Sequence, residues 1–340
     1  MRALVVRGPR SASVEKVPAP VPGPGELLVD VERVGICGTD VELYTGEMAY
    51  FVQGVSHFPL RLGHEWTGRV VAVGGPEDDG WIGRRVTGDT MLGCGHCGDC
   101  RSGRHHVCPD RHEVGIRDGW PGALAEQTLV PARFAHVIPE HVSVPAAALV
   151  EPGGNALRAV WAAALQPGDR VLVLGSGTIG LLAAQLALAE GVEVHVAGDR
   201  EGALALAREL GVHTTAPIDE LTDAADDQYD AVLECTSSAT SPALAVRLVR
   251  PAGRVALIGL SPAPSLLDTR DAVLKDVTAV GILSGSPGLA GAIEHYASGA
   301  VRPDPIVSEV IALEDVASRL DGSRGVAAGP GPKVHVDPRF

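Results

Sequence analysis

The chain has 340 residues, 45% of them hydrophobic and 21% charged, and a formal net charge of −14 at pH 7. This length and composition suit a globular protein of two domains. Nucleic acids and anionic membranes both reward a basic face, so the acidic balance argues against either as a partner. The apolar start of the chain is too short for a signal peptide, and no run of about 18 apolar residues indicates a membrane span, so we expect a cytoplasmic protein.

The first 150 residues predict a β-rich domain. Strand-like runs occur at residues 27–31 and 69–73, and prolines recur at every second position from Pro18 to Pro24. Short apolar runs broken by glycine and proline are typical of strands joined by turns.

Four polar residues of this region are candidate metal ligands: Cys37, His64, Glu65 and Glu151. A cysteine, a histidine and carboxylates from separate segments suit an open catalytic zinc site, in which one position is left for substrate. Taken alone the set is weak, since a lone histidine is more often a core or surface residue than a ligand.

A denser cluster follows, with Cys94, Cys97, Cys100 and Cys108 in the spacing C-x2-C-x2-C-x7-C. Four thiolates at this spacing suit one tetrahedral Zn²⁺ with bonds of about 2.3 Å. Disulfide pairing and an iron–sulfur cluster are the alternatives. The other two cysteines, Cys37 and Cys235, are far apart in sequence, a pattern that fits a reducing compartment with metal ligands. We interpret Cys235 as a small apolar residue at a strand end.

Beyond residue 150 the pattern changes to an alternation of strands and helices, which predicts a parallel sheet covered by helices. The predicted strands are 171–174, 192–197, 231–233 and 255–258, and the predicted helices are 156–165, 181–190, 203–210 and 289–298.

A dinucleotide-binding loop is predicted where Gly175, Gly177 and Gly180 form the motif G-x-G-x-x-G, with Thr178 and Ile179 between the last two glycines. The motif follows a predicted buried strand and opens a helix. That context allows a pyrophosphate to approach the backbone and rest on the helix N-terminus. A glycine-rich turn without a ligand is the alternative.

The end of the next strand bears on the choice of cofactor. Counting from the loop puts Asp199 at the position whose acid binds the ribose hydroxyls of NAD, whereas alignment on the strand puts Gly198 there, with Arg200 near enough to accept the 2′-phosphate of NADP. Both cofactors stay open, and we favour NAD because Asp199 would repel a phosphate.

In their order along the chain, these motifs resemble the zinc-dependent medium-chain dehydrogenase/reductase superfamily, and the resemblance covers essentially the whole chain. It implies an α/β fold with a β-rich GroES-like catalytic domain and a Rossmann-type domain with a doubly wound parallel sheet. The expected boundaries are 1–150 and 287–340 for the first, with a structural zinc lobe at about 93–109, and 151–286 for the second.

Within that superfamily, the residue at the position of Glu151 resembles the polyol, sorbitol and glucose dehydrogenase branches rather than the liver and yeast alcohol dehydrogenases. Two further segments, 37–43 and 112–116, resemble zinc-dependent glucose dehydrogenases. This resemblance implies that Glu113 contacts a sugar substrate. The alternative for Glu113 is a solvated loop acid.

The resemblance implies two zinc ions per chain and hydride transfer between NAD or NADP and a secondary alcohol or carbonyl of a sugar, polyol or related polar substrate. We hypothesise that Cys37, His64 and Glu151 hold the catalytic zinc, with Glu65 as an exchangeable ligand. Thr39 would accept the substrate proton, and Asp40 would hydrogen-bond the far nitrogen of His64.

Two other functions are alternatives. A carbonyl reductase acting on a biosynthetic intermediate would use the same residues, so the sequence does not separate it from a dehydrogenase. A nucleotide-binding redox sensor without turnover fits less well, because the residues at the candidate zinc site are intact. The resemblance also implies a homodimer or homotetramer as the assembly.

Overall fold

A computed structural model describes residues 1–321 and 329–340 of the chain. They divide into two compact units. The first comprises Met1–Glu151, residues 309–321 and Lys333–Phe340, and the second comprises Pro152–Ser308 and Gly329–Pro332. Among the described residues, no helix has the length and apolar character needed to cross a membrane.

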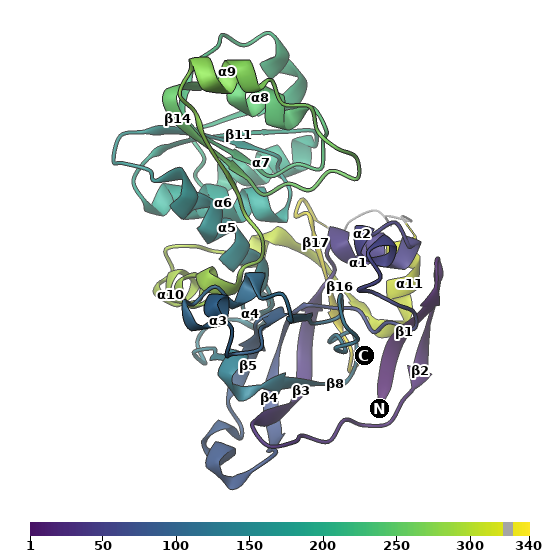
Figure 1. The fold of residues 1–340 in the computed structure, drawn as a ribbon. Helices are drawn as coiled ribbons and strands as arrows, with labels where there is room; N and C mark the ends of the chain where they lie inside the picture. The colour runs from purple at the N-terminus through teal and green to yellow at the C-terminus, as the bar shows by residue number, and fades with distance from the viewer. Residues whose placement is uncertain (322–328) are drawn as a thin grey trace. The chain divides into compact units, whose positions relative to one another are not determined.

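The first unit is built mainly from antiparallel strands (Figure 1). Two small sheets pair β1 (Arg2–Gly8) with β2 (Ser11–Lys16) and β6 (Met91–Leu92) with β7 (His112–Glu113). A seven-stranded sheet runs in the order β16, β17, β3, β4, β5, β9, with β8 also paired to β3. Its strands are β3 (Glu26–Gly35), β4 (Glu65–Val73), β5 (Arg85–Gly88), β8 (Gln127–Pro131), β9 (Ala135–Val137), β16 (Val307–Ala312) and β17 (Lys333–Asp337).

Alternating side chains of this sheet form the core of the first unit. Leu27, Val29 and Val31 of β3 are fully buried, and Trp66 of β4 packs in the same cluster. Short helical segments complete the unit: α1 (Gly38–Thr45), α2 (Ala49–Val52), η1 (Pro76–Trp81), α3 (Gly98–Arg101), η2 (His105–Val107), η3 (Ala132–Phe134), α4 (Val144–Ala148), η7 (Leu313–Asp315) and α11 (Val316–Leu320).

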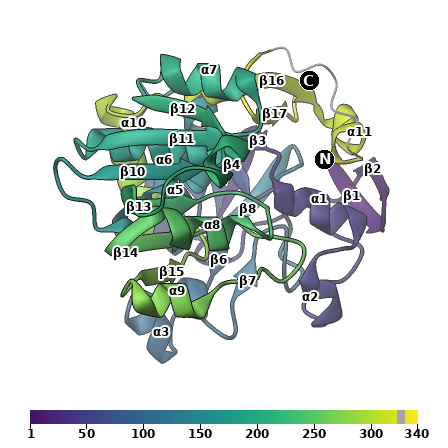
Figure 2. The same ribbon diagram turned by 90° about the horizontal axis from the view of Figure 1, so that it is seen from above.

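The second unit contains a six-stranded parallel sheet in the order β12, β11, β10, β13, β14, β15 (Figure 2). Numbered within the unit, this order is 3-2-1-4-5-6, the doubly wound arrangement of dinucleotide-binding sheets. The strands are β10 (Arg170–Leu174), β11 (Glu193–Gly198), β12 (Thr214–Pro217), β13 (Tyr229–Glu234), β14 (Val249–Leu257) and β15 (Thr278–Gly281).

Helices connect these strands, as the alternating pattern predicted. α6 packs on β10 and β11, α7 on β11 and β12, and α8 on β13 and β14. The helical segments are α5 (Val150–Ala163), α6 (Thr178–Ala189), α7 (Glu201–Glu209), η4 (Ile218–Thr222), α8 (Ser241–Leu248), α9 (Thr269–Leu274), η5 (Ser286–Gly288), α10 (Leu289–Ser298) and η6 (Asp304–Ile306).

The return of the chain to the first unit differs from the expected position. We expected residues 287–340 in the catalytic domain and residue 151 in the other, but residues 287–308 and 329–332 lie in the second unit and Glu151 lies in the first. The reason is close packing of α10 on α5: a Cβ atom on Gly153 would lie 2.1 Å from Tyr296 Oη, and one on Gly154 would lie 3.1 Å from Leu289 Cδ2. Two consecutive glycines therefore hold α10 against the second unit.

Candidate metal and cofactor sites

Cys37 is placed by the start of a helix. It is the N-cap residue of α1, with extended backbone angles (φ −107°, ψ 160°), and its amide donates a 2.9 Å hydrogen bond to Asp40 Oδ2. Asp40, the third residue of α1, thus holds the backbone of Cys37 and with it the direction of the Cys37 side chain. A helix N-terminus also favours the thiolate form that metals bind.

Three predicted ligands come together in the first unit. Suitable donor atoms of Cys37, His64 and Glu65 all lie within 4.8 Å of one another. Tetrahedral zinc ligands at about 2.0–2.3 Å from the ion are roughly 3.3–3.8 Å apart, so these three donors fit one zinc ion after small side-chain adjustments. A set of three also leaves one position for a substrate.

Asp40 lies behind His64, where we expected it. Asp40 is fully buried, its Oδ1 is 3.6 Å from His64 Nδ1, and it also accepts a 3.2 Å hydrogen bond from the amide of Gly63. The 3.6 Å separation is an ion-pair distance and exceeds a hydrogen bond. Burial alone would lower the pKa of His64, but the charge of Asp40 outweighs it and raises this pKa well above its ordinary value.

Lys333 belongs to the same site, and we did not predict it. Its Nζ lies 2.5 Å from Glu65 Oε2 and 3.0 Å from the carbonyl oxygen of Ile36, and both side chains of the ion pair are at most 4% exposed. Burial alone would lower the pKa of Lys333, but the charges of Glu65 and Cys37 raise it. Gly35 makes room for the pair, since a Cβ atom there would lie 2.2 Å from Glu65 Oε2.

A sequence signal for Lys333 does exist. The lysines of the chain are Lys16, Lys275 and Lys333, whereas arginine supplies nearly all other positive charge. In β17, polar residues alternate with valines, so that Lys333 and His335 share one face of the strand. Polar side chains on one face of a buried strand indicate a functional site rather than a part of the hydrophobic core.

Glu151 lies outside this group of three donors. It is buried in the first turn of α5, and Thr90 Oγ1 is 3.4 Å from its Oε1. Its role as a zinc ligand remains a prediction. Thr39, the second residue of α1, is half-buried, and its hydroxyl makes no side-chain hydrogen bond within residues 1–321 and 329–340.

Glu113 is not a solvated loop acid, the alternative that we considered. It lies on β7 and is only 2% exposed. Arg111 Nε donates to its Oε1 at 2.8 Å, and the Tyr50 hydroxyl is 3.2 Å from the same oxygen. A buried carboxylate held by a guanidinium and a phenol is a positioned group.

The four-cysteine lobe has the geometry of a zinc site. Cys94 Sγ and Cys100 Sγ are 3.9 Å apart, and Cys97 Sγ and Cys108 Sγ are 3.7 Å apart. Tetrahedral zinc with four bonds of about 2.3 Å requires sulfur atoms roughly 3.8 Å apart. All six cysteines are free thiols, so the disulfide alternative is wrong.

Backbone amides point at these sulfur atoms. The amide of Cys97 is 3.4 Å from Cys94 Sγ, and the amide of Cys100 is 3.4 Å from Cys97 Sγ. Hydrogen bonds from the amides of His96 and Cys97 lower the pKa of Cys94 to about 6. The chain itself therefore stabilises thiolate at this position, as a metal ligand requires.

The glycines of the dinucleotide loop have three different environments. Gly175 adopts a positive φ of 105°, and a Cβ atom on Gly180 would lie 1.8 Å from the carbonyl oxygen of Gly175. Gly177, the N-cap of α6, has no atom within 4 Å of a Cβ position. The turn, the close helix–strand packing and the open backbone are the three features that a pyrophosphate-binding loop needs.

Thr178 and Ile179 form the first turn of α6, whose amides have no acceptor within the helix and suit an anionic ligand. β11 ends at Gly198, so Asp199 is the first residue after the strand and is exposed, and Arg200 is the half-buried N-cap of α7. Both charged groups therefore stand just after the second strand, where we expected the residue that selects the cofactor.

Comparison with known proteins matches one family model to a segment of each unit. Residues 23–140 match the alcohol dehydrogenase GroES-like domain, and residues 178–298 match the zinc-binding dehydrogenase domain. An L-threonine 3-dehydrogenase from Chelativorans sp. (strain BNC1) is 34% identical over 83% of this chain and 83% of its own length. The chain belongs to the zinc-dependent medium-chain dehydrogenases/reductases.

Solved structures of such dehydrogenases have the same fold over almost the whole chain. A zinc-binding dehydrogenase from Sinorhizobium meliloti 1021, bound to NADP, has a TM-score of 0.90 and 31% identity, with 99% of each chain covered. Galactitol-1-phosphate dehydrogenase from Escherichia coli has a TM-score of 0.86 and 25% identity, with 99% of this chain and 100% of that chain covered.

Membership of this family confirms several predictions at once. The fold is a GroES-like domain joined to a Rossmann-type domain, and the protein is an oxidoreductase of the alcohol dehydrogenase type. The predicted cofactors, zinc and a nicotinamide dinucleotide, are those of the family. The family alone does not select a polyol substrate, because the curated relatives include L-threonine 3-dehydrogenases.

Proposed function

We propose that this dehydrogenase transfers a hydride between NAD(P) and the secondary alcohol or carbonyl of a polar substrate of the sugar and polyol class. The observation that carries the proposal is the group formed by Cys37, His64 and Glu65, with Thr39 two residues after Cys37 in the first turn of α1. A three-donor site with an adjacent proton acceptor suits alcohol oxidation, whereas a purely structural zinc site needs four protein ligands.

A zinc ion held by these residues would supply a Lewis acid that lowers the pKa of a substrate hydroxyl, and a bound dinucleotide would supply the hydride acceptor. The side chains of this unit do the remaining work. Thr39 accepts the hydrogen bond of the substrate hydroxyl and passes the proton towards solvent. Asp40 orients the His64 ring, and Lys333 balances the charge of Glu65. Glu151 is the further carboxylate that we propose as a metal ligand.

Glu113 supports a polar substrate. Its carboxylate already accepts hydrogen bonds from Arg111 and Tyr50, so a substrate hydroxyl would join an existing polar network rather than enter an apolar pocket. The galactitol-1-phosphate dehydrogenase among the structural relatives is consistent with this class. The competing substrate is an amino alcohol, which the L-threonine 3-dehydrogenase relatives favour.

The deciding experiment is a screen of sugars, polyols, L-threonine and simple primary alcohols with NAD⁺ and with NADP⁺, read from the absorbance of the reduced cofactor. We expect the highest kcat/KM for a polyol or sugar. A clear preference for L-threonine would replace the substrate class and leave the metal site assignment intact. Activity with primary alcohols alone would rule out a polar substrate.

Two variants test the site itself. Cys37→Ala should abolish turnover while NADH fluorescence titration still shows cofactor binding, because the dinucleotide loop lies in the other unit. Thr39→Ala should lower kcat by roughly a hundredfold or more, the usual contribution of a proton-transfer group, and Thr39→Ser should restore it. Wild-type activity of Cys37→Ala would remove the catalytic assignment.

The cofactor preference follows from Asp199 and Arg200. We propose NAD as the better substrate, since the exposed Asp199 would repel a 2′-phosphate. Asp199→Ala should then raise kcat/KM for NADP⁺ relative to NAD⁺ by about tenfold, and Arg200→Ala should lower it. The NADP bound to the Sinorhizobium relative favours the opposite preference, which wild-type kinetics with both cofactors would reveal.

A further inference from the structure

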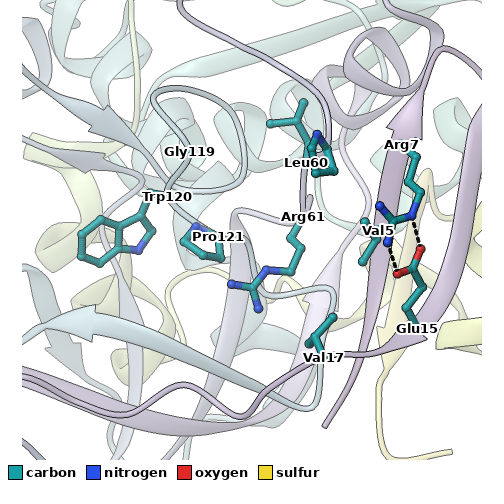
Figure 3. A pocket seen from close by; sticks show the side chains of 10 residues that line it. Val5, Arg7, Glu15, Val17, Leu60, Arg61, Gly119, Trp120 and Pro121 are labelled. Carbon is teal, nitrogen blue, oxygen red and sulfur yellow. Dashed lines mark hydrogen bonds and ion pairs between the residues drawn. The ribbon is translucent and has the colours of Figure 1, made fainter.

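A cavity of about 280 Å³ opens in the first unit (Figure 3). Val5 and Val17 line one side of it, and Trp120 and Pro121 line the other, with Leu60 and Arg61 between them. None of its lining residues is a proposed metal or cofactor ligand. Its volume is close to the lower end of small-molecule pockets, which begin at about 300 Å³.

Arg61 is not paired with the one acidic residue that lines this cavity, Glu15, which binds Arg7 instead. Its side chain is half-buried and makes no hydrogen bond or ion pair with any residue that the structure describes. Burial lowers the pKa of Arg61, and no acidic group raises it again. A partly buried guanidinium without a partner is costly, so this position favours a bound anion.

The other charges of the cavity are already paired. Arg7 holds Glu15 through two hydrogen bonds of 2.8 Å and 2.6 Å, which Figure 3 shows as dashed lines. Ser13 Oγ adds a third contact to the same carboxylate at 3.2 Å. Glu15 is therefore neutralised on its own side of the cavity, and the net positive charge belongs to Arg61.

The apolar groups that line the cavity with Arg61 are held in place. Trp120 Nε1 lies 3.4 Å from the carbonyl oxygen of Leu129, and the carbonyl oxygen of Arg61 accepts a 2.8 Å hydrogen bond from the amide of Gly122. A second cavity of about 190 Å³ shares Arg61, Trp120 and Pro121. The guanidinium thus lies beside an indole ring and a proline ring with open space on two sides.

We propose that this cavity binds a small aromatic carboxylate. The carboxylate would take the two parallel N–H bonds of the Arg61 guanidinium, the strongest arrangement available to this pair. The ring would pack against Trp120 and Pro121, which offer flat apolar surfaces. This site is separate from the proposed catalytic site, and its occupation does not depend on the substrate assigned there.

The test is isothermal titration of the full-length, zinc-loaded protein with benzoate, with benzamide as its uncharged analogue and with inorganic phosphate. We expect benzoate to bind with 1:1 stoichiometry and benzamide and phosphate to bind at least about tenfold more weakly, since one lacks the charge and the other the ring. Cys37→Ala should bind benzoate like the wild type, which excludes carboxylate binding at the catalytic metal.

Three arginine variants locate the site. Arg61→Gln should weaken benzoate binding by about tenfold or more, and Arg61→Lys should bind with intermediate affinity because it keeps the charge and loses the paired N–H groups. Arg84→Gln, which removes an exposed arginine of the same unit, should bind normally. The thermal unfolding midpoint of each variant confirms that it is folded.

Several results would overturn the proposal. Equal affinity for benzoate and benzamide would show that the charge is irrelevant, and phosphate binding as tight as benzoate would show that the ring is irrelevant. Unchanged benzoate binding in Arg61→Gln would place the ligand elsewhere. A lower oligomeric mass of Arg61→Gln in sedimentation would show that a second copy of the chain covers the cavity.

Discussion

Single charged residues decide how the proposed catalytic metal donors are held. Asp40 links the start of α1 to His64 and Gly63. Lys333, the first residue of β17, neutralises the charge of Glu65, the first residue of β4. Both charged groups are buried, so their effect on stability depends on their charged partners and not on hydration.

Loss of Lys333 tests this arrangement. Lys333→Met would leave the Glu65 carboxylate buried without its partner, and breaking one side of a buried ion pair costs about 3–5 kcal/mol. We expect the free energy of unfolding in urea to fall by an amount of this order and zinc content to change with it. The double variant Glu65→Gln/Lys333→Met should lose less than the sum of the single variants. Additive losses would show that the two residues act independently.

His335 makes the folding stability of the protein depend on pH. It is fully buried on the same strand as Lys333, and burial, with the charges of Lys333 and Arg33, lowers its pKa well below 6.5. Below about pH 6.5 the unfolded chain therefore binds a proton that the folded chain excludes, so stability falls as the pH falls, by up to about 1.4 kcal/mol per pH unit.

His335→Gln removes this titration. We expect the difference in unfolding midpoint between pH 7.5 and pH 5.5 to be smaller in His335→Gln than in the wild type, and unchanged in His57→Gln, which alters an exposed histidine. Equal pH profiles for wild type and His335→Gln would mean that other groups cause the acid sensitivity.

At the scale of elements, the two candidate zinc sites differ in how much secondary structure and apolar core surrounds the metal-binding residues. The three proposed catalytic donors are the N-cap residue of α1, the residue before β4 and the first residue of β4. β4 belongs to a sheet with its own apolar core. The four-cysteine lobe contains only the four-residue α3 and the three-residue η2 between short strands. Helices of this length do not form without added constraint, so we expect a bound metal to order the lobe.

Cys100→Ser separates the two sites. We expect zinc content to fall from two ions to one per chain, and trypsin to cut at Arg101 or Arg104 once the lobe loses its metal. NADH binding should persist, since the dinucleotide loop lies in the second unit. Cys235→Ala, which changes a thiol outside the lobe, should keep both ions. A zinc content of two in Cys100→Ser would contradict the four-thiolate site.

At the scale of the molecule, the sheet of the second unit ends at β12 and at β15, and neither end strand pairs with a further strand among the described residues. β15 ends the order of six strands, and three of its four residues are exposed. Leu266, Val273 and Leu274 near this edge are 87%, 77% and 79% exposed. An open strand edge beside exposed apolar side chains is a template for pairing with another chain. We therefore propose this edge as the contact of a homodimer.

A charge placed near this edge tests the dimer. Leu274→Glu should shift the protein from dimer to monomer at micromolar concentration in sedimentation equilibrium, because a dimer would bury the new carboxylate without a partner. Val52→Glu, which changes a 92% exposed residue of the first unit, should remain dimeric. A dimeric Leu274→Glu would move the contact to another surface.

Much of this protein was predictable because it depends on short stretches of sequence. The cysteine spacing, the glycine loop after a buried strand and the alternation of strands and helices each act over a few residues, where periodicity and turn chemistry are readable. The helix at 289–298 was predicted with its bounds, whereas the start of α5 at Val150 was hidden by Pro152, Gly153 and Gly154, which are poor helix formers.

Only the tertiary structure decided which distant residues meet. Lys333 reaches Glu65 across 268 positions of sequence. Glu113 is buried against Arg111 and Tyr50 rather than solvated, and α10 joins the second unit because two glycines of α5 let it approach. The sequence alone determined the family, the fold and the candidate ligands. Long-range packing decided their partners, because burial and charge pairing depend on neighbours in space that no local pattern encodes.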